Sequence, residues 1–70
     1  MRLSTRNHLS GTVTEVNLGS VMATVKVRLD GGEQIITASI TKEAAEELGL
    51  AEGSSVTALV KSTEVMLGVE

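Results

Sequence analysis

The 70-residue chain contains no aromatic residue, no cysteine and no proline, and it has a single histidine. Without cysteine the chain can form neither a disulfide nor a thiolate metal site. One histidine without a cluster of carboxylates does not make a zinc site either. The absence of aromatic rings removes the platforms on which single-stranded nucleic acids stack, and the formal net charge of -3 opposes binding to phosphate. We therefore expect no metal site and no nucleic-acid partner.

The chain also lacks the long apolar run, about 20 residues, that a membrane-spanning helix needs. Residues 1–5 carry a charged side chain but no apolar stretch, which is not typical of a signal peptide, so we expect a cytoplasmic protein without membrane contact. Residues 1–70 form one domain at most. A domain this short buries only about 60% of its unfolded surface, so its core is marginal. Because neither a disulfide nor a metal adds to that core, the expected supplement is self-association.

Apolar residues that alternate with polar ones predict a strand at residues 21–30. One face of this strand is formed by Val21, Ala23, Val25, Val27 and Leu29. The Asp30-Gly31-Gly32 segment that follows is typical of a hairpin turn, because glycine accepts the positive φ that tight turns require. The chain then returns as a strand at residues 33–40, in which Ile36, Ala38 and Ile40 share a face.

Three more strands are predicted at residues 9–16, 56–61 and 65–69. In the first of them Val13 and Val16 have opposite parity, which indicates a bulge or a strand end between the two residues. Between the third and fourth strands, Thr41 is a suitable N-cap for a short helix over residues 42–48, and Gly49 suits the position just after it. Three strands, a helix and two strands are the element order of an OB-fold, so we predict an all-β, five-stranded barrel with one helix. An SH3-like barrel is the competing fold.

The residues that could perform catalysis are few. The single histidine, His8, has no recognisable nucleophile motif around it, and we interpret it as a surface or interface imidazole. The adjacent acids Glu46 and Glu47 point about 100° apart on a helix and form no carboxylate dyad. The glycine pairs lack the lysine and hydroxyl residues that complete a phosphate-binding loop. We therefore do not expect an enzyme.

Cations stand beside small hydroxyl groups in two segments, Ser4-Thr5-Arg6-Asn7 and Lys61-Ser62-Thr63. Thr41 adds a hydroxyl at the start of the predicted helix, where unpaired backbone N–H groups favour anions. A tetrahedral oxyanion is bound by such donors, because arginine and lysine supply charge-assisted hydrogen bonds and hydroxyls complete the shell. Two cations would balance a dianion. From spacing alone a structural interpretation is favoured, because Thr41 is mainly a helix cap and serine and threonine are common at strand ends.

Three segments, taken in order, carry a resemblance to a known family. They are Ser4-Thr5-Arg6-Asn7-His8-Leu9-Ser10-Gly11, the segment from Ile40 to Leu50, and the segment from Val60 to Val69. Together they resemble the molbindins, the small Mop-type molybdate-binding proteins of the TOBE/Mop family. The resemblance covers nearly the whole chain.

The resemblance implies an OB-like barrel that assembles as a homohexamer, a trimer of dimers, with oxyanion sites between subunits. It implies storage or homeostasis of molybdate or tungstate without chemistry and without a cofactor. By motif position the implied oxyanion ligands are Ser4, Arg6, Thr41, Lys61 and Ser62. Ala44 stands where the family has a serine at the helix start. The alternative is an oligomerisation or sensor module, derived from a molybdate-responsive regulator or transporter, that binds the anion weakly.

Overall fold

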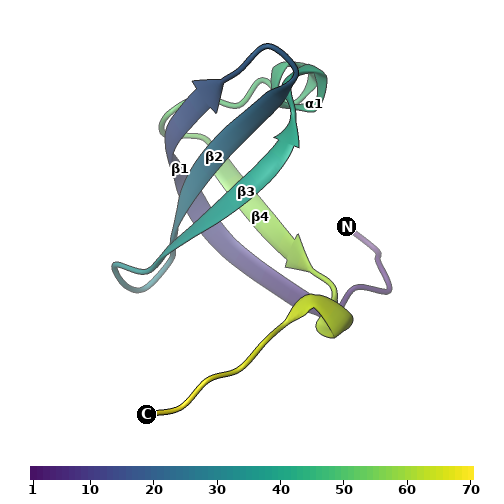
Figure 1. Cartoon of the computed structure of the whole chain (residues 1–70), viewed down its shortest axis with the longest axis vertical. Helices are drawn as coiled ribbons and strands as arrows, with labels where there is room; N and C mark the ends of the chain where they lie inside the picture. Colours follow the sequence, from purple (N-terminus) through teal and green to yellow (C-terminus); the bar gives the residue numbers. More distant parts are fainter.

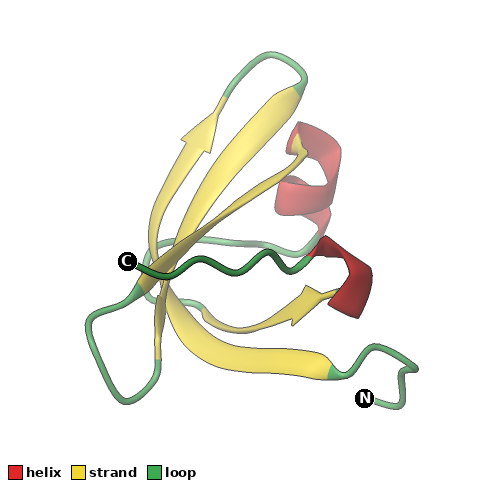
Figure 2. Ribbon diagram, turned by 60° about the horizontal axis from the view of Figure 1, so that its bottom comes forward, coloured by secondary structure: helices red, strands yellow, loops and turns green.

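The protein folds as a single curled antiparallel sheet with one short helix at one end of the sheet (Figures 1 and 2). The computed structural model describes all residues from 1 to 70. Its elements are β1 (Asn7–Leu18), β2 (Met22–Leu29), β3 (Ile35–Thr41), α1 (Lys42–Glu47), β4 (Ser55–Val60) and a 3-10 turn, η1 (Ser62–Glu64). The strands lie in the order β3-β2-β1-β4. The predicted all-β architecture, with a helix between the third and fourth strands, is confirmed.

Strand β1 holds the sheet together because it pairs with two neighbours in succession. Its first half, from Asn7 to Thr12, pairs with β4, and its second half, from Gly11 to Leu18, pairs with β2. The two ladders overlap at Gly11 and Thr12. A Cβ atom on Gly11 would lie 2.6 Å from both the Arg28 carbonyl oxygen and the Val27 side chain. Glycine is therefore required at this position for the strands to approach so closely.

A β-bulge in the second half of β1 confirms the parity change seen in the sequence. Val13 pairs with Val27, and the next pair is Glu15 with Lys26, which leaves Thr14 as the extra residue. Because a bulge reverses the side-chain alternation, Val13 and Val16 both pack into the apolar interior. The bulge also increases local twist, which helps the sheet to curl.

The core of a single chain is small. A cluster of Val13, Val25 and Val27 lies on the concave face of the sheet, and only six of the 70 residues are buried. The predicted inner face of β2 is confirmed for Ala23, Val25 and Val27, whereas Val21 lies before the strand and is exposed. This small number of buried side chains agrees with the expectation that a 70-residue domain without disulfides is only marginally stable alone.

Helix α1 begins and ends as the sequence predicts. The Thr41 hydroxyl accepts a hydrogen bond from the Ala44 backbone N–H at 3.0 Å, which caps the first turn. At the other end Gly49 has a φ of +63°, and the N–H groups of Gly49 and Leu50 donate to the carbonyls of Glu46 and Ala45. This pair of bonds is a Schellman motif, which needs the left-handed conformation that glycine adopts without strain.

The prediction of a fifth strand at residues 65–69 is wrong for the single chain, which has four strands. After β4 the chain makes the η1 turn and then runs away from the sheet as an extended tail (Figure 1). The side chains of Leu67 and Val69 are 95% and 100% exposed. The apolar alternation is that of a strand, but strand structure requires hydrogen bonds to a neighbour, and within one chain the tail meets none.

Candidate oxyanion-binding site

The two predicted cation-and-hydroxyl segments lie together at one end of the sheet. Asn7 pairs with Val60 at the end of the β1–β4 ladder, and the Asn7 side-chain amide donates to the Val60 carbonyl at 3.1 Å. The residues just before β1 therefore lie beside the residues just after β4. They line a pocket of about 250 Å³ that consists of Ser4, Thr5, Arg6, Lys61, Ser62 and Thr63. We call this pocket the cationic pocket.

The charge of the cationic pocket suits an anion. Its lining contains the two cations Arg6 and Lys61, four hydroxyl residues, and neither a carboxylate nor an apolar side chain. None of the side-chain hydrogen bonds within the protein engages Arg6 or Lys61, so their donors are available to a ligand. Two cations without a nearby acid can neutralise a dianion, and the hydroxyls can orient its oxygens.

Of the five residues predicted from the sequence, the structure places Ser4, Arg6, Lys61 and Ser62 in the cationic pocket. Thr5 and Thr63 also line it, although they were not among the implied ligands. Thr5 and Thr63 could have been predicted as lining residues, because they are adjacent to Arg6 and Ser62 in the sequence. His8 lies just outside the pocket, where its Nε2–H donates to the Thr5 carbonyl oxygen.

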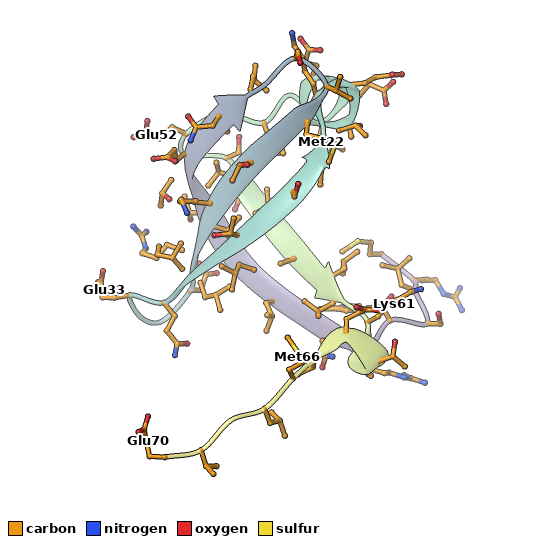
Figure 3. The ribbon with its side chains drawn as sticks, viewed as in Figure 1. Met22, Glu33, Glu52, Lys61, Met66 and Glu70 are labelled. Atoms are coloured by element: carbon orange, nitrogen blue, oxygen red, sulfur yellow. The ribbon has the colours of Figure 1, made fainter.

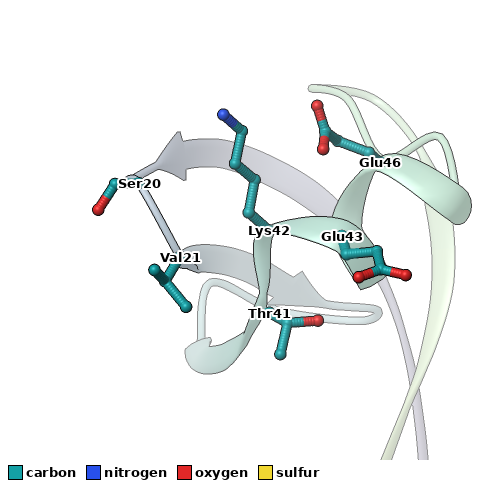
Figure 4. A pocket seen from close by; sticks show the side chains of 6 residues that line it. All are labelled: Ser20, Val21, Thr41, Lys42, Glu43 and Glu46. Carbon is teal, nitrogen blue, oxygen red and sulfur yellow. The ribbon is translucent and has the colours of Figure 1, made fainter.

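The fifth predicted residue, Thr41, lies at the opposite end of the sheet. It pairs with Met22, and Figure 3 shows Met22 far from Lys61 along the length of the strands. Here a second pocket of about 470 Å³ is lined by Ser20, Val21, Thr41, Lys42, Glu43 and Glu46 (Figure 4). We call it the helix-end pocket. A single chain therefore does not bring Thr41 to the other four residues.

The charge of the helix-end pocket differs from that of the cationic pocket. One cation, Lys42, is accompanied by two acids, Glu43 and Glu46 (Figure 4). The Thr41 hydroxyl accepts the capping hydrogen bond from Ala44, but its own O–H remains able to donate. This end offers a neutral donor and no net positive charge. Ser20 and Val21 were not predicted for this pocket; they lie in the turn before β2, which the register places beside Thr41.

No group of three or more histidine, cysteine, aspartate or glutamate side chains is arranged to hold a metal ion. None of the helices is long and apolar enough to cross a membrane. The cationic pocket is therefore the strongest candidate for function.

Comparison with known proteins places this geometry in a family. A family model described as "TOBE domain" matches residues 3–67. The chain is 45% identical over 67 residues to molybdenum-pterin-binding protein 2 of Clostridium pasteurianum, covering 96% of this chain and 97% of that protein. It is 50% identical over 70 residues to the molybdenum transport protein ModE of Azotobacter vinelandii, and there it spans 100% of this chain but only about a quarter (26%) of the relative.

A similar solved structure is that of the cytoplasmic molybdate-binding protein ModG with molybdate bound. It superposes with a TM-score of 0.92 at 48% identity, over 100% of this chain and 49% of that chain. The family model and the small clostridial relative each cover nearly the entire sequence, including both segments of the cationic pocket. The chain belongs to the TOBE domain family, as one of its Mop-type (molbindin) members.

Proposed function

We propose that the protein binds molybdate or tungstate, stores it without chemical change, and needs no cofactor. The observation that carries this proposal is the cationic pocket, where Arg6 and Lys61 stand among hydroxyls with no acid in the lining. A tetrahedral dianion satisfies both cations and accepts hydrogen bonds from the surrounding hydroxyls. The relatives named above bind molybdenum compounds, and ModG binds molybdate, which supports the same ligand here.

The complete site is shared between copies of the chain. Arg6 and Lys61 neutralise the anion, Ser4 and Ser62 fix two of its oxygens, and Thr41 of a neighbouring copy donates from the helix-end pocket. This division would account for the position of the five residues at two opposite ends of the sheet. It requires a homo-oligomer, and the resemblance to molbindins points to a hexamer built from three dimers. The small core supports such an assembly, because apolar faces that one chain leaves open become buried against another.

No catalytic step is part of this function. The cationic pocket contains hydroxyls but no base to activate them, since His8 lies outside it and uses Nε2 to bind the Thr5 carbonyl. Discrimination against sulfate comes from cavity size, because sulfate has the same charge and donor geometry but a smaller radius. Phosphate is partly protonated at neutral pH, so it carries less negative charge than a full dianion and matches the two cations less well. We place this store in the cytoplasm as a single domain over residues 1–70, without nucleic-acid or membrane partners.

Calorimetric titration with molybdate, tungstate and sulfate, combined with native mass spectrometry, tests the proposal. We expect molybdate or tungstate to bind at micromolar concentration or tighter to an oligomer, and sulfate to bind more weakly. The absence of molybdate and tungstate binding at micromolar concentration would refute storage. A monomeric mass with tight binding would refute the shared site.

A further inference from the structure

The two segments that form the cationic pocket are held in place in different ways. The segment after β4, residues 61–63, is fixed by its own backbone, because in η1 the Glu64 N–H donates to the Lys61 carbonyl at 2.9 Å. The segment before β1, residues 4–6, makes no backbone–backbone hydrogen bond. We call the first segment the lysine arm and the second the arginine arm. A segment without such bonds samples many conformations, so a side chain has to fix the position of Arg6.

A single side chain supplies this link to the arginine arm. The His8 Nε2–H donates to the Thr5 carbonyl oxygen, and none of the other side-chain hydrogen bonds in the protein involves residues 1–6. Because a carbonyl oxygen only accepts, the ring nitrogen that faces it carries the proton. The bond joins two residues three positions apart, so it closes a loop that contains Arg6.

His8 is suited to hold the arm because it belongs to the paired part of β1. It pairs with Leu59 in the ladder with β4, so the position of its backbone is set by the sheet. Its partner Thr5 is half-buried, whereas the other residues from 1 to 6 are exposed. The imidazole therefore connects the fixed sheet to the one point of the arginine arm that is partly covered.

We propose that His8 is a positioning residue of the oxyanion site and that it sets the selectivity of this site. The proposal rests on the proposed function, in which cavity size discriminates molybdate from sulfate. A cavity discriminates by size only when its walls keep a fixed separation, because a mobile arm closes around the smaller anion as well. His8 holds the arginine arm in a fixed position opposite the lysine arm. Loss of its hydrogen bond therefore lowers the preference for molybdate as well as the affinity.

The test compares two uncharged amide substitutions that differ in length. In His8→Gln the amide nitrogen takes the place of Nε2 and still donates to the Thr5 carbonyl, whereas in His8→Asn it takes the place of Nδ1 and falls short of this oxygen. Isothermal titration calorimetry of the full chain with molybdate and with sulfate gives the ratio of the two Kd values. We expect His8→Asn to weaken molybdate binding by about 2- to 10-fold, the equivalent of one hydrogen bond, and to lower the sulfate-to-molybdate Kd ratio. His8→Gln should retain the wild-type affinity and ratio.

The Kd ratio separates positioning from a purely structural role. A loss of folded protein lowers the apparent affinity for both anions by the same factor and leaves the ratio unchanged. A wild-type ratio in His8→Asn therefore overturns the proposal. A ratio that falls equally in His8→Gln overturns it as well, because that variant keeps the donor.

A measurement without ligand tests the arginine arm itself. The NMR order parameters of the backbone amides at residues 4–6 should fall in His8→Asn toward the values below about 0.6 that mark flexible backbone, and should stay at the wild-type level in His8→Gln. Unchanged order in His8→Asn overturns the proposal. A wild-type protein that binds neither anion refutes the proposed function instead, and the order parameters then decide whether His8 positions the arm.

Discussion

The two ends of the sheet present similar hydroxyl groups but different balances of charge. At the end where β1 begins, Arg6 and Lys61 stand among serines and threonines without an acid. At the end where β3 meets α1, the single cation Lys42 is joined by Glu43 and Glu46. Hydroxyls alone do not neutralise an anion, because a buried charge needs an opposite charge as well as hydrogen bonds. Only the first end can provide the charge for a dianion, and the second can add at most a neutral donor.

The comparison predicts its largest effect, a loss of molybdate affinity, when a cation is removed from the cationic pocket. Arg6 and Lys61 are exposed in a single chain, and the proposed assembly buries them around the anion. Arg6→Ala and Lys61→Ala should then each weaken molybdate binding by about 2–5 kcal/mol, the range for removing one partner of a buried charge pair. That is at least about 30-fold in Kd. Isothermal titration calorimetry measures the change. Lys42→Ala is the matched control at the other end and should change Kd less than about threefold, because two acids already offset this cation. An equal loss in Lys42→Ala would contradict the assignment of the cationic pocket.

A second prediction concerns the strand that joins the two ends. Gly11→Ala would place its Cβ atom 2.6 Å from the Arg28 carbonyl oxygen, so β1 and β2 must separate locally. We expect a loss of about 1–3 kcal/mol in the free energy of unfolding, the usual cost of overpacking. Denaturation by urea measures it. Gly32→Ala, where a Cβ atom meets nothing within 4 Å, serves as the control and should leave stability unchanged or slightly raised. Equal stability of the two variants would mean that the close approach at Gly11 is not needed.

Removing the Thr41 hydroxyl tests the helix end by itself. Thr41→Ala deletes the cap on the Ala44 N–H and should lower stability by about 1 kcal/mol. If Thr41 of a neighbouring copy also donates to the anion, molybdate affinity should fall by about fivefold, equivalent to one neutral hydrogen bond. Thr41→Ser retains the hydroxyl and should restore both properties. Full affinity in Thr41→Ala, measured at a temperature where the protein remains folded, would remove Thr41 from the site.

The smallest expected effect is a gain of affinity at the helix end. Glu46→Gln removes one of the two acids of the helix-end pocket while it preserves the size of the side chain. If this pocket approaches the anion in the assembly, less repulsion should tighten molybdate binding by about twofold, in line with a screened charge. The same substitution at Glu47, which lies outside the pocket, should have no effect. A weaker affinity in Glu46→Gln would show that this acid supports the site.

Much of the local structure was predictable because its causes are local. Three features depend only on residues within a few positions of one another: the alternation in residues 21–30, the glycine turn after it, and the capping of α1 by Thr41. The bulge after Val13 was visible as a change of parity for the same reason. The fifth strand was predicted from a genuine pattern at Val65, Leu67 and Val69, but pairing depends on a distant neighbour. Within one chain that neighbour is not reached.

The candidate site was predictable in part. Ser4 and Arg6, and also Lys61 and Ser62, were identified as cations beside hydroxyls, and the structure places all four in one pocket. Thr41 was assigned to the same site by resemblance, yet the fold puts it at the far end of the strands. The sequence does not show this distance between Thr41 and the other four residues. It results from the order and direction of the strands in the sheet, which place the end of β3 far from the start of β1.

The sequence by itself determined which residue types are available for function. It removed aromatic stacking, thiolate metal sites and long apolar spans, and it placed each strand, turn and cap by rules that act over a few residues. The tertiary structure decided which of those residues meet. The pairing of Asn7 with Val60 brings the two ends of the chain together as one cationic pocket, and the sheet order leaves β3 and β4 as open edges. Strand pairing is non-local, so only the folded chain shows which residues share the cationic pocket and which strand edges have no neighbour.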